Sequence, residues 1–75
     1  MSEADVGKRV SVQGYESKGT LRFFGKHKHT GVLRCGVELD EAVGKNNGTV
    51  RGFAYFKCSA NHGVLCNPGK VTVME

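Results

Sequence analysis

The chain is organised around the stretch Gly44-Lys45-Asn46-Asn47-Gly48. Two glycines enclose one cation and two amides, and no apolar side chain lies between them, so this segment does not build core. Glycine adopts positive φ without steric cost and Asn tolerates it better than most residues, which predicts a tight turn. Such a turn presents an ammonium group and carboxamides, which are donors suited to a carboxylate. The same residues are also typical of an ordinary hairpin connection, and only the surrounding sequence separates the two interpretations.

The size and composition of the chain predict one small folded domain. A chain of 75 residues buries only roughly 60% of its unfolded surface, which argues against a large catalytic cavity. The 11 glycines are about twice the usual share of ~7% and favour many turns between short elements. We expect the polar residues 1–5 to form a flexible leader and residues 6–75 to form the single domain.

The formal net charge of +4 indicates an acidic partner. Nucleic acid, an anionic membrane and an acidic peptide all fit this charge, and the scattered cations are equally typical of a solvated surface. The N-terminus lacks the apolar segment of a signal peptide, and the longest apolar runs are far below the ~20 residues that span a bilayer. The odd number of cysteines, 3, argues against a closed disulfide framework. We therefore expect an intracellular protein that has no membrane partner.

Short alternating segments between turn residues predict an all-β fold. No segment keeps a 3.6-residue apolar period over ten residues. We expect a small antiparallel β-barrel, in which closure removes the exposed sheet edges. The expected strands cover residues 9–13, 20–24, 35–39, 49–50, 52–58, 64–66 and 70–73, with a long basic loop at 26–34. The expected core consists of Val10, Val12, Leu21, Phe23, Val37, Leu39, Tyr55, Phe56, Val64, Val71 and Val73, and Cys35 is expected to face it.

Three residues of ligand type, Cys58, His62 and Cys66, form a C-x3-H-x3-C pattern. Zinc requires four nitrogen or sulfur ligands, and His27 or His29 could supply the fourth. The C-x2-C hook typical of zinc sites is absent and buried free cysteines are common, so we expect no metal. A Cys-His catalytic pair needs a third orienting group, and nothing in the sequence marks a pocket for it. We expect no enzyme activity and no cofactor.

A nucleic-acid-binding barrel is the main alternative from another class of binding function. Basic charge together with Phe23, Phe24, Phe53 and Tyr55 could make a stacking platform. Most bulky side chains of a small domain are buried, however, and no RNA-binding motif is present. The aromatic residues are therefore interpreted mainly as core.

Several motifs, most of which contain glycine, follow one another along the chain: Val6-Gly7-Lys8-Arg9-Val10, Gly19-Thr20-Leu21-Arg22-Phe23-Phe24-Gly25, Gly36-Val37-Glu38-Leu39-Asp40-Glu41, Gly44-Lys45-Asn46-Asn47-Gly48-Thr49-Val50, Gly52, Tyr55-Phe56-Lys57-Cys58 and Gly63. In residues and in order, these motifs resemble those of the CAP-Gly domain family. The resemblance covers about Val6 to Val73 and implies a small β-barrel related to SH3 domains, in agreement with the strand pattern. It also implies binding of acidic C-terminal tails that end in Glu-Glu-Tyr or Glu-Glu-Phe, as on α-tubulin, end-binding proteins and the linker proteins that track microtubule plus ends.

The resemblance also implies a peptide-binding site. Lys45 and Asn46 match the motif positions that contact the peptide terminus. Phe53 lies where a groove residue is expected, and Lys70 lies where a polar side chain near the peptide end is expected. The predicted site residues are Lys45, Asn46, Asn47, Gly48, Phe53, Lys70, Arg34 and His29.

The sequence departs from the family pattern at four positions where the family usually carries an acidic or aromatic residue. Asn47 replaces the usual acid of the glycine box, and Arg34 aligns with the usual tryptophan, in a chain that has no Trp. Leu65 replaces a phenylalanine, and His29 replaces an aromatic residue of the preceding loop. Arg34 and His29 could compensate by stacking or by added charge. The resemblance predicts a cytoplasmic module at microtubules; a module of a tubulin-folding cofactor, or a barrel that has lost tail recognition and binds another protein or nucleic acid, stays open.

Overall fold

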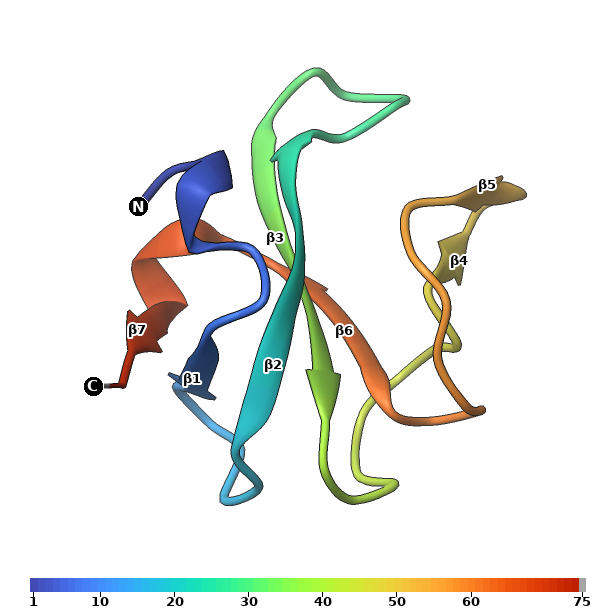
Figure 1. Ribbon diagram of the computed structural model, residues 1–75. Helices are drawn as coiled ribbons and strands as arrows, with labels where there is room; N and C mark the ends of the chain where they lie inside the picture. Colours follow the sequence, from blue (N-terminus) through green and yellow to red (C-terminus); the bar gives the residue numbers. More distant parts are fainter. Residues whose placement is uncertain (75) are drawn as a thin grey trace.

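The computed structural model describes residues 1–74 and is all-β, as the sequence predicts. A five-stranded antiparallel sheet has the order β6-β3-β2-β1-β7, and a separate two-stranded hairpin is formed by β4 and β5 (Figure 1). Two short 3-10 turns, η1 and η2, accompany the strands. The bounds are η1 Glu3–Asp5, β1 Arg9–Val12, β2 Gly19–Lys26, β3 Leu33–Leu39, β4 Thr49–Val50, β5 Phe53–Ala54, β6 Gly63–Cys66, η2 Pro68–Lys70 and β7 Val71–Val73.

One face of the five-stranded sheet carries the main core, which is aliphatic. Alternation places Val10 and Val12 of β1 on this face. Val12 pairs with Val71 of β7, and Leu21 of β2 pairs with Val37 of β3. The predicted inward face of β3 is confirmed. The buried cluster comprises Val10, Val12, Leu21, Cys35, Val37, Leu39, Val64 and Val71.

The predicted closed barrel is wrong. The sheet is strongly curved, but its outer strands β6 and β7 do not pair with each other within residues 1–74. Closure would require a ladder between these two short strands, and the chain between them is only the η2 turn. The main sheet is therefore open, with β6 and β7 as its edge strands.

A β-bulge in β2 changes which aromatic residues reach the core. The register shifts between Leu21 and Phe23, so that Leu21 pairs with Val37 and Phe23 pairs with Gly36. One extra residue reverses the side-chain alternation that follows it. Phe24 consequently packs against the main cluster, whereas Phe23 lies on the other face against the ring of Tyr55. The prediction that Leu21 and Phe23 share a core face is wrong for this reason.

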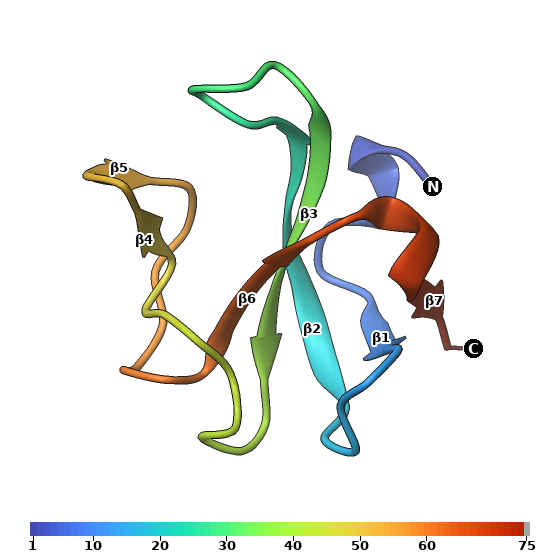
Figure 2. The same cartoon turned by 180° about the vertical axis from the view of Figure 1, so that it is seen from behind.

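The predicted strand at 52–58 is mostly wrong. Only Phe53–Ala54 is extended, because Arg51 and Gly52 both have positive φ (52° and 80°) and turn the chain back on Thr49–Val50. This two-residue turn is the preferred connection of a tight hairpin. After it, the backbone N–H groups of Tyr55 and Phe56 both donate to the Gly48 carbonyl oxygen instead of to a strand. Seen from behind, the hairpin stands apart from the main sheet (Figure 2).

The remaining segments adjust the predicted boundaries. The basic loop is shorter than expected, because Lys26 pairs with Leu33 and extends β2 and β3 into it. At the N-terminus, Ser2 caps the η1 turn in a reciprocal capping box with Asp5. That the leader is flexible stays a prediction. Within the described residues, no helix is both long enough and apolar enough to span a membrane.

Candidate functional site

The glycine box 44–48 is not the tip of a hairpin. Asn46 instead forms an antiparallel bridge with Gly63 at the start of β6. The amides of Lys45 and Asn46 donate to the Gly63 carbonyl at 2.8 and 3.1 Å, and the Gly63 amide donates to the Asn46 carbonyl at 2.7 Å. Neither Asn46 nor Asn47 has positive φ. The prediction of a tight turn that uses the left-handed tolerance of Asn is therefore wrong, and the box is a bent segment that docks beside β6 through the bridge at Asn46.

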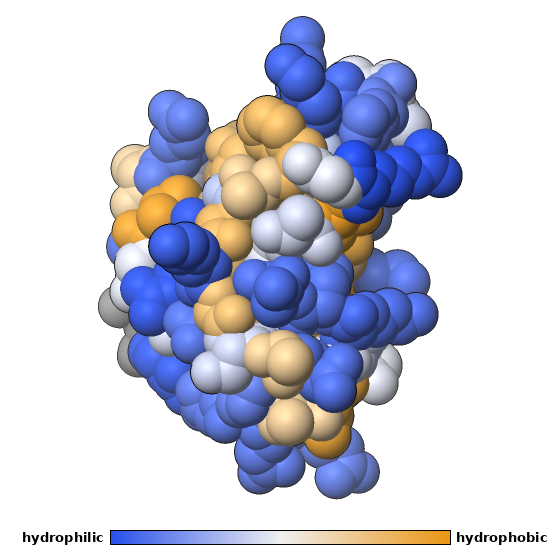
Figure 3. Space-filling view, turned by 90° about the vertical axis from the view of Figure 1, so that its right-hand side faces the viewer, coloured by the Kyte–Doolittle hydropathy of each residue, from blue (hydrophilic) through white to orange (hydrophobic). Residues whose placement is uncertain are grey.

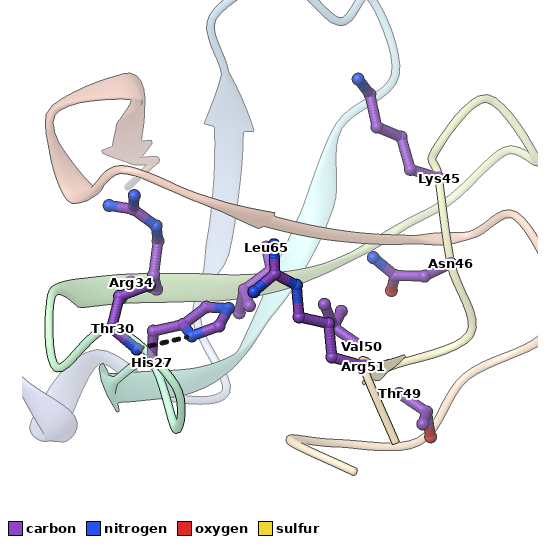
Figure 4. Close-up of a pocket in the computed structure, with 9 residues that line it drawn as sticks. All are labelled: His27, Thr30, Arg34, Lys45, Asn46, Thr49, Val50, Arg51 and Leu65. Carbon is purple, nitrogen blue, oxygen red and sulfur yellow. Dashed lines mark hydrogen bonds between the residues drawn. The ribbon is translucent and has the colours of Figure 1, made fainter. Parts of the chain in front are cut away.

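The two asparagine side chains serve as local hydrogen-bond acceptors. The Oδ1 atom of Asn46 accepts from the Gly48 amide at 2.8 Å, and the Oδ1 atom of Asn47 accepts from the Thr49 amide at 3.1 Å. Because its oxygen is occupied, Asn46 turns its Nδ2 group toward a neighbouring cavity (Figure 4). The donor that the sequence predicts at this position is thus held in a fixed direction.

Two glycines make this close docking possible. Gly48 has φ of +97°, and a Cβ atom there would overlap the Phe56 carbonyl group. Gly63 faces Asn46 so closely that a Cβ atom would overlap the Asn46 Oδ1 atom. Both positions therefore require glycine, for backbone approach at Gly63 and for conformation and approach at Gly48.

Two open cavities adjoin each other next to β6. The first, of about 470 Å³, extends toward the β4–β5 hairpin, and the second, of about 430 Å³, extends toward β1 and η2. Arg34, Lys45 and Leu65 line both. The first is completed by His27, Thr30, Asn46, Thr49, Val50 and Arg51, and the second by Val12, Gln13, Tyr15, Val64, Cys66, Asn67 and Lys70.

Every charged side chain that lines the two cavities is basic. No acidic side chain is among their lining residues within 1–74. Acidic side chains elsewhere form ion pairs with other cations: Asp5 with Lys8, Asp40 with Arg9 and Glu38 with Arg22. Arg34, Lys45, Arg51 and Lys70 form no ion pair with any described residue. This separation leaves a positive field in the cavities that favours an anionic ligand.

The ring of His27 lies within this positive field. Burial lowers the pKa of His27 below its ordinary value of 6.5, and the nearby charges of His29, Arg51 and Arg34 lower it further. Figure 4 shows Arg51 extending from the hairpin over the middle of the first cavity, with His27 on its wall. An anionic ligand in this cavity would oppose the shift.

An aromatic cluster fixes the basic loop 27–32 to the hairpin. The Tyr55 ring packs edge-on against Phe23 and Phe53, with ring centroids 5.1 and 4.7 Å apart. Its hydroxyl accepts a 2.7 Å hydrogen bond from the Lys28 amide, and the Lys28 ammonium lies 5.4 Å from the centre of the Phe53 ring. On the face that carries the hairpin, hydrophobic surface forms a broken band flanked by hydrophilic side chains (Figure 3).

Comparison with known proteins identifies the family. The sequence pattern of the CAP-Gly domain matches residues 6–71. The chain belongs to the CAP-Gly family. It is 43% identical over 70 residues to dynactin subunit 1 of Gallus gallus and 40% identical to that of Xenopus laevis, in each case over 93% of this chain but only 6% of the relative.

Solved CAP-Gly domains have the same fold. The CAP-Gly domain of human kinesin-like protein KIF13B superposes with a TM-score of 0.82 at 34% identity, covering 91% of this chain and 67% of that one. The Bik1 CAP-Gly domain, solved with an ETF peptide from Bim1, superposes with a TM-score of 0.80 at 23% identity, covering 91% and 82%. The resemblance inferred from the sequence motifs is confirmed.

The structure of this CAP-Gly domain brings together half of the predicted site residues. Lys45, Asn46 and Arg34 line the first cavity, and Lys70 joins Lys45 and Arg34 in the second. The other four predicted residues, Asn47, Gly48, Phe53 and His29, line neither cavity.

Each of these four has another place. Asn47 lines a different cavity together with Lys57 and Cys58, and Gly48 is buried at a bend of the backbone. Phe53 stays 38% exposed beside Tyr55, and His29 Nε2 lies 3.4 Å from the Arg51 carbonyl oxygen.

Sequence reasoning missed several residues of the first cavity. His27, Thr30, Val50 and Arg51 line it and were not predicted as site residues. For Arg51 the Arg-Gly pair before Phe53 is a turn signal, but it does not tell where the side chain extends. His27 and Thr30 belong to the basic loop, whose position depends on its hydrogen bond to Tyr55.

The cysteines and histidines of this CAP-Gly domain do not converge. All three cysteines are free thiols, and no three His, Cys, Asp or Glu side chains of residues 1–74 lie close enough together to hold a metal ion. Burial raises the pKa of Cys35 to about 11 and also raises the pKa values of Cys58 and Cys66, which disfavours the thiolate. His62 directs Nδ1 to the Leu39 carbonyl oxygen at 2.8 Å, not to a thiol.

Proposed function

We propose that this CAP-Gly domain is a non-enzymatic module that binds acidic C-terminal tails ending in Glu-Glu-Tyr or Glu-Glu-Phe. The observation that carries the proposal is the pair of adjoining cavities lined by Arg34, Lys45, Arg51 and Lys70 without an acidic partner. Such a surface attracts a chain of carboxylates, and its attraction weakens with salt. The partners would be α-tubulin, end-binding proteins or linker proteins, which places the module in the cytoplasm at microtubules.

A related domain supports the choice of ligand. The Bik1 CAP-Gly domain was solved with a peptide ETF, which combines an acidic residue with a phenylalanine. Dynactin subunit 1, which is 43% identical over the matched region, carries the domain within a much longer chain. The proposal transfers the ligand class of the first to this chain, whose own cavities have the charge to accept it.

The side chains would divide the work of recognition. The fixed Nδ2 group of Asn46 and the ammonium of Lys45 are donors for the terminal carboxylate. Arg34 and Lys70 would meet the preceding glutamates. Val50 and Leu65 offer the terminal ring an apolar surface. The Arg51 guanidinium lies over this surface and can stack on the terminal ring. In this way Arg51 would compensate for the missing tryptophan.

The proposal is tested by an NMR titration with a peptide ending in Glu-Glu-Tyr and with the same peptide lacking its tyrosine. Shifts at Lys45, Asn46 and Arg51 that require the intact terminus would support it. Replacing Lys45 by Ala should weaken binding about tenfold through loss of a charge-assisted contact. Lys18→Ala is the matched control, because Lys18 is exposed and lines neither cavity. Equal shifts from both peptides, or equal losses from both variants, would refute terminus recognition.

A further inference from the structure

The free edge of β6 carries an unpaired backbone position between the two cavities. Gly63 directs its N–H and carbonyl groups away from β3, because both bond to residues 45–46. His62 directs its carbonyl toward β3, where it accepts from the Leu39 amide at 2.7 Å. Alternate residues of an antiparallel strand direct their backbone groups to the same side. The N–H and carbonyl groups of Leu65 therefore point away from β3, like those of Gly63. No backbone group of residues 1–74 bonds to Leu65 on this side.

We propose that the acidic tail binds as an added β-strand, antiparallel to β6, with one tail residue exchanging two backbone hydrogen bonds with Leu65. This inference rests on the proposed function and adds the conformation and direction of the ligand. The bridge between Asn46 and Gly63 already begins the ladder, and the tail would continue it along the same edge. Strand addition of this kind derives affinity from the main chain and specificity from alternate side chains.

The position of the charges selects the antiparallel direction. β6 runs from Gly63 to Cys66, so the carboxyl end of an antiparallel tail lies at the Gly63 end, beside Lys45 and Asn46. Earlier residues, spaced about 3.4 Å apart, extend toward Lys70. A parallel tail would instead direct its terminal carboxylate away from the fixed Asn46 donor.

The two cavities lie on the two faces of the sheet beside this edge. The first includes Val50 and Arg51 of the hairpin, and the second includes Val64 and Cys66, which face the main core. Successive side chains of a strand point to opposite faces. A tail paired with Leu65 would therefore place neighbouring side chains in different cavities, on either side of Arg34, Lys45 and Leu65, which line both.

The first test is an N-methyl scan of a six-residue peptide ending in Glu-Glu-Tyr. Methylation at the residue paired with Leu65 removes one hydrogen bond and should weaken binding about tenfold. Methylation at either neighbour, whose N–H points away from β6, should change affinity by less than about twofold. Equal effects at consecutive positions would overturn the inference.

The second test is amide hydrogen exchange of the 75-residue chain with and without that peptide. The Leu65 amide should slow at least about tenfold at saturation, because it gains a partner. Val73 is the matched control. Its backbone N–H points away from β1 on β7, the other edge strand, and its exchange rate should not change. An unchanged Leu65 amide in a complex that still depends on Lys45 would refute strand addition and leave the proposed function standing. Absence of any peptide binding would refute both.

Discussion

The two faces of the sheet at strands β3 and β6 are built from different side chains. One face packs eight small or aliphatic residues into a continuous buried cluster. The other is covered by the excursion between β3 and β6, residues 40–62, which packs aromatic rings against the sheet and against the basic loop. The first face resembles a conventional core, whereas the second depends on a few rings, single hydrogen bonds and glycine contacts.

This difference separates stability from function. The cations and donors of the candidate site come mainly from the aromatic side and from the edge of β6, not from the aliphatic core. Free energy of unfolding should therefore depend most on the aliphatic cluster, and binding should depend most on how the excursion is held. Four changes test this division, from the largest expected effect to the smallest.

Replacing Leu21 by Ala should produce the largest loss. Leu21 is fully buried, and truncation leaves a cavity in a core with few other residues. We expect the free energy of unfolding to fall by about 3 to 4 kcal/mol. Urea denaturation followed by circular dichroism measures this loss. Leu33→Ala, at a leucine that is 46% exposed, is the control and should change stability by less than about 0.5 kcal/mol. Equal losses would mean that the aliphatic cluster is not the main core.

Replacing Gly48 by Ala should destabilise the excursion by about 2 to 3 kcal/mol, because strain at positive φ adds to overlap with the Phe56 carbonyl. Gly52→Ala is the matched control: Gly52 also has positive φ, but a Cβ atom there meets nothing within 4 Å. The difference between the two urea midpoints measures the cost of close approach alone. If both variants lose the same stability, the docking of Gly48 on Phe56 contributes nothing.

Replacing Tyr55 by Phe should cost about 1 kcal/mol, because the Lys28 amide loses its partner in the phenolic oxygen while the ring packing stays. The expected effect is local, at the junction of the basic loop and the hairpin. Amide exchange at Lys28 should accelerate, while exchange at Val37 in β3 should follow only the global change. Phe53→Leu, which removes a ring without touching this hydrogen bond, should leave the Lys28 amide protected.

The smallest effect concerns pH and His27. Its folded pKa lies below the ordinary value of 6.5, so the folded state favours the neutral ring. Its contribution to stability is complete above pH 6.5 and is lost as the pH falls through the folded pKa. A bound acidic tail should raise this pKa, so peptide affinity should rise over the same fall in pH. Urea midpoints and peptide titrations at two pH values should show opposite trends, and both should be smaller in His27→Gln. A variant that keeps both trends unchanged would exclude His27 as their source.

Most of the aliphatic region could be predicted from the sequence. Val10 and Val12, and Cys35, Val37 and Leu39, alternate with other residues, and the structure buries them as expected. The motif around Lys45 and Asn46 predicted the family, and both residues line the first cavity. The aromatic region could not be predicted in the same way, because short runs such as 52–58 have the composition of a strand but bond to Gly48 instead.

The sequence by itself determined the all-β class, the membership of the family, the inward faces of β1 and β3 and the separation of glycine-rich from apolar segments. These follow from local periodicity and from motif spacing, which act over a few residues. Tertiary structure alone decided the β2 bulge that moves Phe23 away from the core, the open edge of β6 and the convergence of His27, Arg34 and Arg51 on one cavity. Those features depend on which distant segments pair and pack, and a two-residue period carries no information about that choice.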